Sequence, residues 1–292
     1  MKHINLKESK KWKVLILMIV LSFVFLSLYA VAQGIVSIIE PLLPFVVACL
    51  LLGSLLLTLY FLSVKIIEGK LPNSLKLSLL PRHLVTGLAV GFGFFITIAF
   101  ILYITGCYSA GTISFEPYII KALAFYFLVA CSEELVFRGI LFRMLDTRWN
   151  YLIAMVISGL IFGLAHLPNP NATIWSAIAI AIEAGLLLGA AYKVSGTLWF
   201  PIGIHWAWNF TEGPLLGFNV SGTSDFSSLL NPTIRGAKIF TGGDFGPETS
   251  IITVILGLML VALFTHKAFS KVNVQLLLIS FKQSTFEYPV LC

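Results

Sequence analysis

The sequence predicts an all-α, polytopic membrane protein, a helix bundle of about eight transmembrane helices. Two properties of its composition support this fold class. Of the 292 residues, 58% are hydrophobic and 11% are charged, whereas soluble domains carry roughly a quarter charged residues. The mean hydropathy is +0.96. One soluble core could not bury so much apolar surface, so the composition excludes a soluble globular domain, a disordered chain and a disulfide scaffold.

The apolar residues gather in segments of membrane-spanning or nearly membrane-spanning length. These segments cover residues 14–39, 42–64, 84–106, 119–144, 151–167, 173–192, 197–212 and 250–266. A basic leader precedes the first segment, which is longer than the core of a signal peptide, so we expect an uncleaved helix. No internal repeat or soluble second domain interrupts the series, and we expect one integral membrane domain over residues 1–292. The longest hydrophilic stretch is 213–249.

The basic residues sort by side when the N-terminus is placed in the cytoplasm and the chain is threaded through these spans. Of the 19 Lys and Arg residues, only Lys121, Arg235 and Lys238 then fall outside, in agreement with the positive-inside rule. The sequence thus predicts a multi-pass protein of the cell membrane with both termini cytoplasmic. This sorting explains the net charge of +6, and no cluster of basic and aromatic residues indicates a nucleic-acid partner.

The fourth segment breaks the rule that ionisable groups avoid the middle of the bilayer. Glu134 and Arg138 are four residues apart, with the acid first, which favours a helical ion pair. That pair could serve helix packing alone. Glu133 is rotated about 100° from Glu134 around a helix and has no well-placed cation in this span. A carboxylate without a cation in a cavity is suited to act as a general base, although both acids could be structural.

Histidines mark two further segments. The fifth ends with His166, just before Pro168 stops the helix, and a lone His there is more often an interfacial or capping residue. In the seventh, His205 and Asn209 are four apart and share a helix face, where they could form an interhelical hydrogen-bond clamp. Glu183 in the sixth segment could face the same cavity or make a polar packing contact.

Taken together, a carboxylate, two imidazoles and an amide on three spans are the groups needed for water activation and oxyanion stabilisation. A transporter with a proton relay is the main alternative. It predicts acids spaced along a path and matching broken helices in two halves, whereas these residues form one group. A non-catalytic immunity protein that binds a peptide is a second alternative.

The same residues resemble the motifs of the CPBP intramembrane protease family, also called the CAAX protease and bacteriocin-processing (Abi) family. The family pattern is EExxxR, FxxxH and HxxxN/D on successive membrane helices. Here it reads Glu133-Glu134…Arg138, Phe162…His166 and His205…Asn209. The resemblance covers residues 120–212, the expected catalytic core.

The resemblance implies an intramembrane endopeptidase, similar to CAAX prenyl proteases, that cleaves membrane-associated or lipidated proteins or peptides. Its expected partners are the lipid bilayer and a protein or peptide substrate. By position, Glu133 would activate water and His166 would hold or polarise it, while His205 and Asn209 would stabilise the oxyanion. The supporting residues would be Glu134, Arg138 and Phe162.

The need for a metal stays open at this point. The family is often labelled metalloprotease, and a divalent metal such as zinc would be held by Glu133, His166 and His205. A metal-free mechanism based on glutamate fits the residues equally well.

The expected depths of the candidate catalytic residues in the membrane differ. At 1.5 Å per residue, Glu133 is about 16 Å, His166 about 24 Å and His205 about 12 Å from the inner ends of their spans. Tilt or uneven helix ends must bring them together if they form one site.

Overall fold

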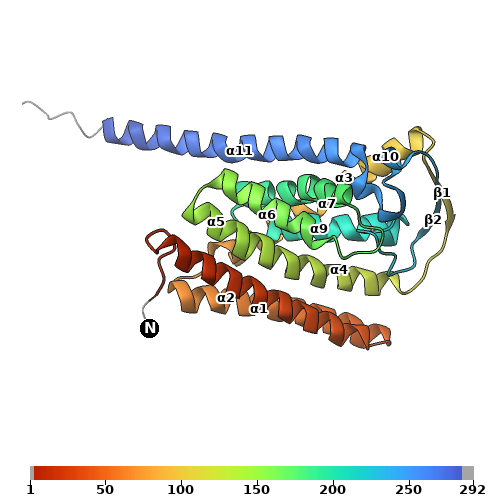
Figure 1. Cartoon of the computed structure of the whole chain (residues 1–292), viewed down its shortest axis with the longest axis horizontal. Helices are drawn as coiled ribbons and strands as arrows, with labels where there is room; N and C mark the ends of the chain where they lie inside the picture. Colours follow the sequence, from red (N-terminus) through yellow and green to blue (C-terminus); the bar gives the residue numbers. More distant parts are fainter. Residues whose placement is uncertain (1–2, 285–292) are drawn as a thin grey trace, which may run out of the picture.

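The computed structural model describes the backbone of residues 3–284 and the side chains of residues 3–270. A helix occupies each predicted segment (Figure 1). Three of these helices are built from α-helical and π-helical parts in direct succession. In chain order the elements are α1 (Lys11–Ser37), α2 (Leu42–Glu68), α3 (Leu80–Ile104), α4 (Ile119–Glu134) with η3 (Leu135–Phe142) and α5 (Arg143–Arg148), α6 (Tyr151–Ala165), α7 (Ile174–Ile180) with η4 (Ala181–Leu186) and α8 (Leu187–Ser195), α9 (Trp199–Phe210) with η5 (Thr211–Leu215), and α11 (Ile251–Ser284).

Several of these helices can cross a membrane by themselves. Among the described residues, 5 are long and apolar enough, namely Lys11–Ser37, Leu42–Glu68, Leu77–Ile104, Ile174–Ser195 and Ile251–Ser270. The polytopic helical fold is therefore confirmed. The number of eight spans stays a prediction, because α6 is shorter, and the helices that begin at Ile119 and at Trp199 fall outside this group.

The outer helices turn apolar side chains away from the protein. In α1, 17% of the most apolar window is buried inside the protein, against 72% for the helix Ile174–Ser195. Phe23 and Ile19 of α1 are 71% and 63% exposed. Such a continuous apolar surface fits lipid rather than water. The helix Ile174–Ser195 is instead mostly surrounded by protein.

Glycines allow the helices around the site to approach closely. A Cβ atom at Gly91 of α3 would lie 2.2 Å from the carbonyl oxygen of Ile204, and one at Gly87 would lie 2.4 Å from that of Phe200. A Cβ atom at Gly163 of α6 would likewise lie 2.1 Å from the carbonyl oxygen of Ala177. Small residues of this kind let membrane helices pack backbone to backbone. They fix α9 against α3 and α6 against α7.

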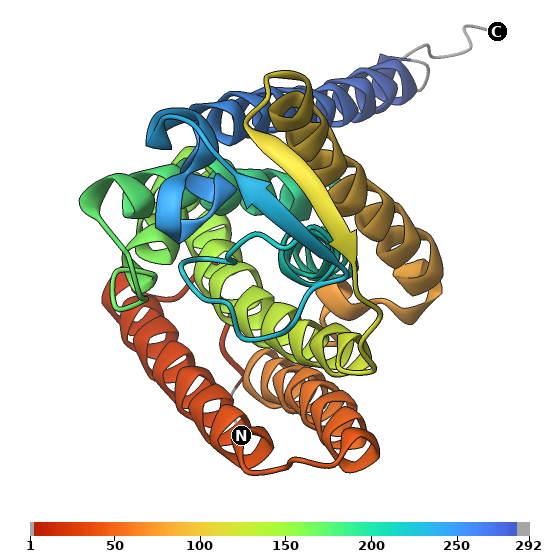
Figure 2. The ribbon, with the colours of Figure 1, turned by 90° about the vertical axis from the view of Figure 1, so that its right-hand side faces the viewer.

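The hydrophilic stretch 213–249 is folded. It contributes a strand to a small sheet, so the expectation of an all-α fold is wrong in this one detail. β1 (Tyr108–Ile113) pairs antiparallel with β2 (Leu230–Ile234) in a two-stranded sheet, and the short helix α10 (Lys238–Thr241) follows. Backbone groups outside the apolar helices need partners, and the two loops supply them to each other. The sheet crosses one end of the bundle, the end away from the start of α1 (Figures 1 and 2).

The connections that were predicted to share the cytoplasmic side do lie at one end of the bundle. The backbone N–H of Ile4 donates to the carbonyl of Ile67 at 2.8 Å, and the side chain of Arg148 donates to the carbonyl of Ser9 at 3.2 Å. α1 begins and α11 ends on this side (Figure 1). The chain termini themselves, residues 1–2 and 285–292, lie outside the described residues.

Candidate active site

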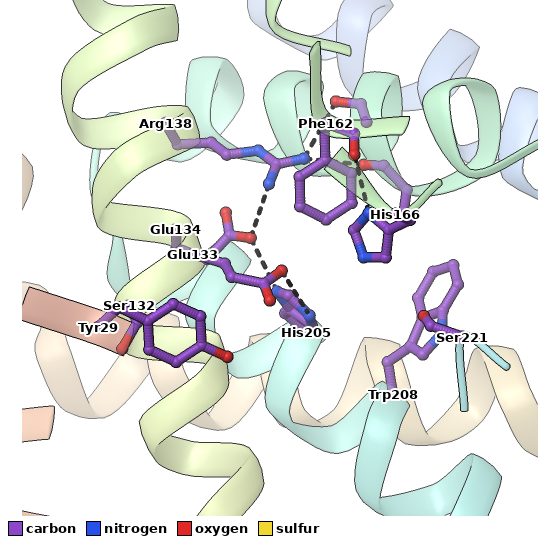
Figure 3. A network of polar contacts seen from close by, with 12 residues as sticks. Tyr29, Ser132, Glu133, Glu134, Arg138, Phe162, His166, His205, Trp208 and Ser221 are labelled. Carbon is purple, nitrogen blue, oxygen red and sulfur yellow. Dashed lines mark hydrogen bonds and ion pairs between the residues drawn. The ribbon is translucent and has the colours of Figure 1, made fainter. Parts of the chain in front are cut away.

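Glu134 lies at the centre of a buried polar network (Figure 3). Its Oε1 atom accepts a hydrogen bond from Nη1 of Arg138 and another from Nδ1 of His205, each at 2.9 Å. The Arg138 and Glu134 side chains are 1% and 0% exposed. The predicted ion pair is therefore confirmed. It also holds the imidazole of His205, a contact that sequence spacing alone could not show.

Arg138 links this network to a second helix through two π-helical segments. Its Nη2 atom donates to the carbonyls of Ala184 and Gly185, at 3.1 and 3.2 Å. Both carbonyls belong to η4, and Arg138 itself lies in η3. Widened turns of this kind occur often at functional sites. The guanidinium also lies over the ring of Phe162, 4.4 Å from its centroid, so the expected supporting residue contacts the ion pair.

Glu133 projects from the end of α4 toward His205 (Figure 3). Its Oε2 atom is 3.9 Å from Nε2 of His205, and its side chain is 16% exposed. This distance exceeds a direct hydrogen bond. Tyr29 of α1 lies beside Glu133 in the same view, and its hydroxyl accepts a hydrogen bond of 2.6 Å from Nε2 of Gln33. Sequence reasoning missed both α1 residues, because no motif marks that helix.

His166 and Phe162 bring α6 to the same place. Nδ1 of His166 donates to the carbonyl of Phe162 at 2.8 Å, so Nε2 is the nitrogen left for other contacts. The Phe162 ring lies 4.8 Å from the His166 ring and 6.2 Å from the His205 ring, between centroids. The differing depths are thus reconciled by uneven helix ends. α6 has only 15 residues, whereas the helix that contains Glu133 continues through α4, η3 and α5 from Ile119 to Arg148.

One cavity of about 980 Å³ joins the expected catalytic residues. Its lining includes Glu133, His166, His205 and Asn209. Glu183 is not among its lining residues and is 0% exposed. It packs against α11, where a Cβ atom at Gly257 would lie 2.9 Å from its Cα. Glu183 therefore does not face the cavity, and neither of its carboxyl oxygens has a hydrogen-bond partner among the described residues, so the expected polar contact is not seen either.

Glu248, from the turn before α11, is a further acid in the lining. Its Oε2 atom accepts hydrogen bonds from the backbone N–H and the hydroxyl of Ser221, at 2.7 and 2.8 Å, and its Oε1 atom accepts one from Nε1 of Trp208 at 3.3 Å. Burial raises the pKa of the Glu248 carboxyl, while the Ser221 bonds and the nearby His166 oppose that rise. Sequence reasoning missed this residue, since nothing in the pattern of 213–249 points into the bundle.

The described side chains include no preformed metal site. Within the part of the chain that the structure describes, no three His, Cys, Asp or Glu side chains are placed to hold a metal ion. Nδ1 of His205 is bonded to Glu134, and Nδ1 of His166 is bonded to a carbonyl. These bonds leave Nε2 of each histidine for other contacts. Zinc held by Glu133 and the two histidines therefore stays a prediction, and we derive no step through a metal.

Comparison with known proteins agrees with the motifs. Residues 115–211 match the family model described as type II CAAX prenyl endopeptidase Rce1-like. Searches of curated proteins and of solved structures give no match. The matched range includes Glu133, His166, His205 and Asn209, which meet at the cavity. This match supports the assignment of the segment that builds the cavity's polar core to the CPBP/CAAX protease family.

Proposed function

We propose that this protein is an intramembrane endopeptidase in which Glu133 activates a water molecule for attack on a peptide bond. The observation that carries the proposal is the convergence of Glu133, His166, His205 and Asn209 on one cavity inside a membrane helix bundle. A single chamber suits hydrolysis better than transport, because a proton relay needs acids spaced along a path. The family match supports the same class of reaction.

Glu133 is the proposed general base. The 3.9 Å between its Oε2 atom and Nε2 of His205 is too long for a direct hydrogen bond and suits a water that contacts both groups. Glu133 takes one proton from this water while the oxygen bonds to the carbonyl carbon of the substrate. Nε2 of His166, free of the carbonyl that holds Nδ1, helps to orient the same water.

His205 and Asn209 are the proposed oxyanion donors. They lie one helical turn apart on α9 and both line the cavity. When His205 is protonated, its charge and that of Arg138 balance those of Glu133 and Glu134, so the buried cluster carries no net charge. Preorganised donors of this kind stabilise a tetrahedral intermediate. The carbon–nitrogen bond then breaks, and the proton held by Glu133 passes to the leaving amine.

Glu134 and Arg138 are proposed as positioning residues. The carboxylate of Glu134 fixes Nδ1 of His205 as the protonated nitrogen, so Nε2 faces Glu133. Arg138 in turn holds Glu134 and is itself fixed by two backbone carbonyls. A buried carboxylate that orients a catalytic imidazole raises catalysis without touching substrate.

Glu133→Gln tests the proposal, with Glu183→Gln as the matched control. Both changes remove one carboxyl group inside the helix bundle with little change of shape, but only Glu133 lines the cavity. Hydrolysis of a quenched fluorescent peptide library by purified protein should fall by about 10²-fold or more in Glu133→Gln, the range for loss of a general base. Glu183→Gln should remain close to wild type. Size-exclusion profiles should be unchanged in both, and near-normal activity of Glu133→Gln would refute the mechanism.

A further inference from the structure

The cavity opens at the end of the bundle that carries the β1–β2 sheet. The most exposed of its lining residues lie where α1 ends, where α4 begins and in the loop after α9; they are Ser37, Glu40, Tyr118, Asp225 and Ser227. Deep in the bundle the lining is closed by Phe162, Ile180 and Leu188, which are 1% to 2% exposed. No lining residue comes from the connections 65–79 or 143–150 at the opposite end.

Basic side chains are concentrated at that opposite end. They include Lys65, Lys70, Lys76, Arg143, Arg148 and Lys193. At the open end the described basic residues are Lys121, Arg235 and Lys238. Short connections rich in Lys and Arg stay in the cytoplasm. We infer that the mouth of the cavity faces the non-cytoplasmic side of the membrane.

The exposed charge at this mouth is negative. Glu40 and Asp225 are exposed lining residues. Lys121 also lines the cavity but is only 9% exposed. Its amine donates to the backbone carbonyl of Glu40 and lies 5.1 Å from the ring centroids of both Phe45 and Tyr118. The amine of Lys121 therefore has partners already. Oδ2 of Asp225 accepts a hydrogen bond of 3.0 Å from the Thr223 hydroxyl, but among the described residues no cation pairs with Asp225 or with the carboxylate of Glu40.

Aromatic rings complete the mouth. Phe125 and Phe226 pack 5.4 Å apart, between centroids, and both line the cavity, as does Tyr126. Carboxylates beside aromatic faces favour ligands that combine cationic and apolar groups. We propose that the substrate is a peptide segment of an exported or membrane-anchored polypeptide, with basic and apolar side chains, that reaches the site from the non-cytoplasmic side. The proposal rests on the proposed protease function, and it excludes a cytosolic prenylated tail as the substrate.

Labelling with a membrane-impermeant maleimide tests the side of access without any need for activity. Glu116→Cys places a thiol on an exposed residue at the open end, and Lys70→Cys places one on an exposed residue at the other end. The background carries Cys107→Ser and Cys292→Ser, while Cys49 and Cys131 are 0% exposed. Intact cells should label Glu116→Cys, and Lys70→Cys should label only after permeabilisation. The reverse pattern would overturn the proposed side.

Kinetics with peptides of different charge test the substrate class. In the double variant Glu40→Gln/Asp225→Asn, KM for a cationic peptide should rise by about three- to tenfold, as expected for loss of two nearby opposite charges in water. kcat should stay near wild type, and KM for a neutral peptide of the same length should not change. Asp244→Asn, an exposed acid at the same end that does not line the cavity, is the matched control. An equal effect on both peptides would overturn the charge preference.

The two proposals fail in different ways. If purified protein cleaves the peptide in detergent but intact cells cleave it only after permeabilisation, the side of access is wrong and the protease function stands. If Glu133→Gln cleaves as fast as wild type, the protease mechanism is wrong whatever the labelling pattern shows.

Discussion

Replacing Arg138 with methionine removes the cation at the centre of the site and tests how the buried network is held. The change breaks the 2.9 Å ion pair with Glu134 and leaves two carbonyls without their donor. Loss of one partner of a buried pair costs about 3–5 kcal/mol, because the other charge stays buried without compensation. We therefore expect Arg138→Met to lower the free energy of unfolding by about 4 kcal/mol.

The double variant Glu134→Gln/Arg138→Met separates loss of the whole ion pair from loss of one of its charges. Glu134→Gln alone should cost about 3 kcal/mol, the lower end of that range, because it leaves the Arg138 charge without its carboxylate but keeps an amide oxygen in its place. Glu134→Gln/Arg138→Met removes both charges, so it should cost less than the sum of the single changes by about 2 kcal/mol or more. Reversible unfolding in mixed detergent micelles gives the free energies. Single effects that add within about 0.5 kcal/mol would refute the coupled network.

The pair formed by Lys193 and Asp146 is the matched control. Its atoms are closer, at 2.6 Å, but its side chains are 31% and 22% exposed. The same cycle with Lys193→Met and Asp146→Asn should give a coupling below about 1 kcal/mol, since water and salt screen partly exposed pairs. A coupling as large as that of the buried pair would show that distance rather than burial sets the energy.

Other changes probe separate parts of the site. Tyr29→Phe removes a hydroxyl beside Glu133 and should lower kcat by about tenfold with little effect on KM, so an unchanged kcat would exclude a role for α1 in the chemistry. Burial raises the pKa of Glu248, so its protonated carboxyl contributes to the stability of the folded state at acid pH, and this contribution is lost as the pH rises through the folded-state pKa. The melting temperature of Glu248→Gln should therefore depend less on pH than that of the wild type. Gly163→Ala should destabilise the protein by about 1–3 kcal/mol, because the added methyl group meets the carbonyl of Ala177. Activity should survive treatment with a chelator, and loss of activity that zinc restores would contradict the metal-free mechanism.

Much of the local structure follows from residue type and spacing. Long apolar segments predict helices because a backbone in lipid must satisfy its own hydrogen bonds. The four-residue spacing of Glu134 and Arg138 predicts their contact, which is present at 2.9 Å. The same spacing places His205 and Asn209 on one face of α9, and both line the cavity.

Contacts between distant segments could not be read from the sequence. Arg138 donates to the carbonyls of Ala184 and Gly185, and both helices contain π-helical turns at these positions. No residue pattern in the sequence predicts those turns. Glu248 meets Trp208 across forty positions of chain. The β1–β2 sheet likewise depends on two loops that meet only after the helices have packed.

By itself, the sequence determined that this is a polytopic helical membrane protein and which polar residues break its apolar segments. Hydropathy and helical spacing are local properties, and they need no knowledge of neighbours. The tertiary structure decided that Glu133, His166 and His205 meet at one cavity despite their different expected depths, and at which end that cavity opens. Those outcomes depend on where each helix ends and on how closely glycines let helices pack, and packing between distant segments sets both.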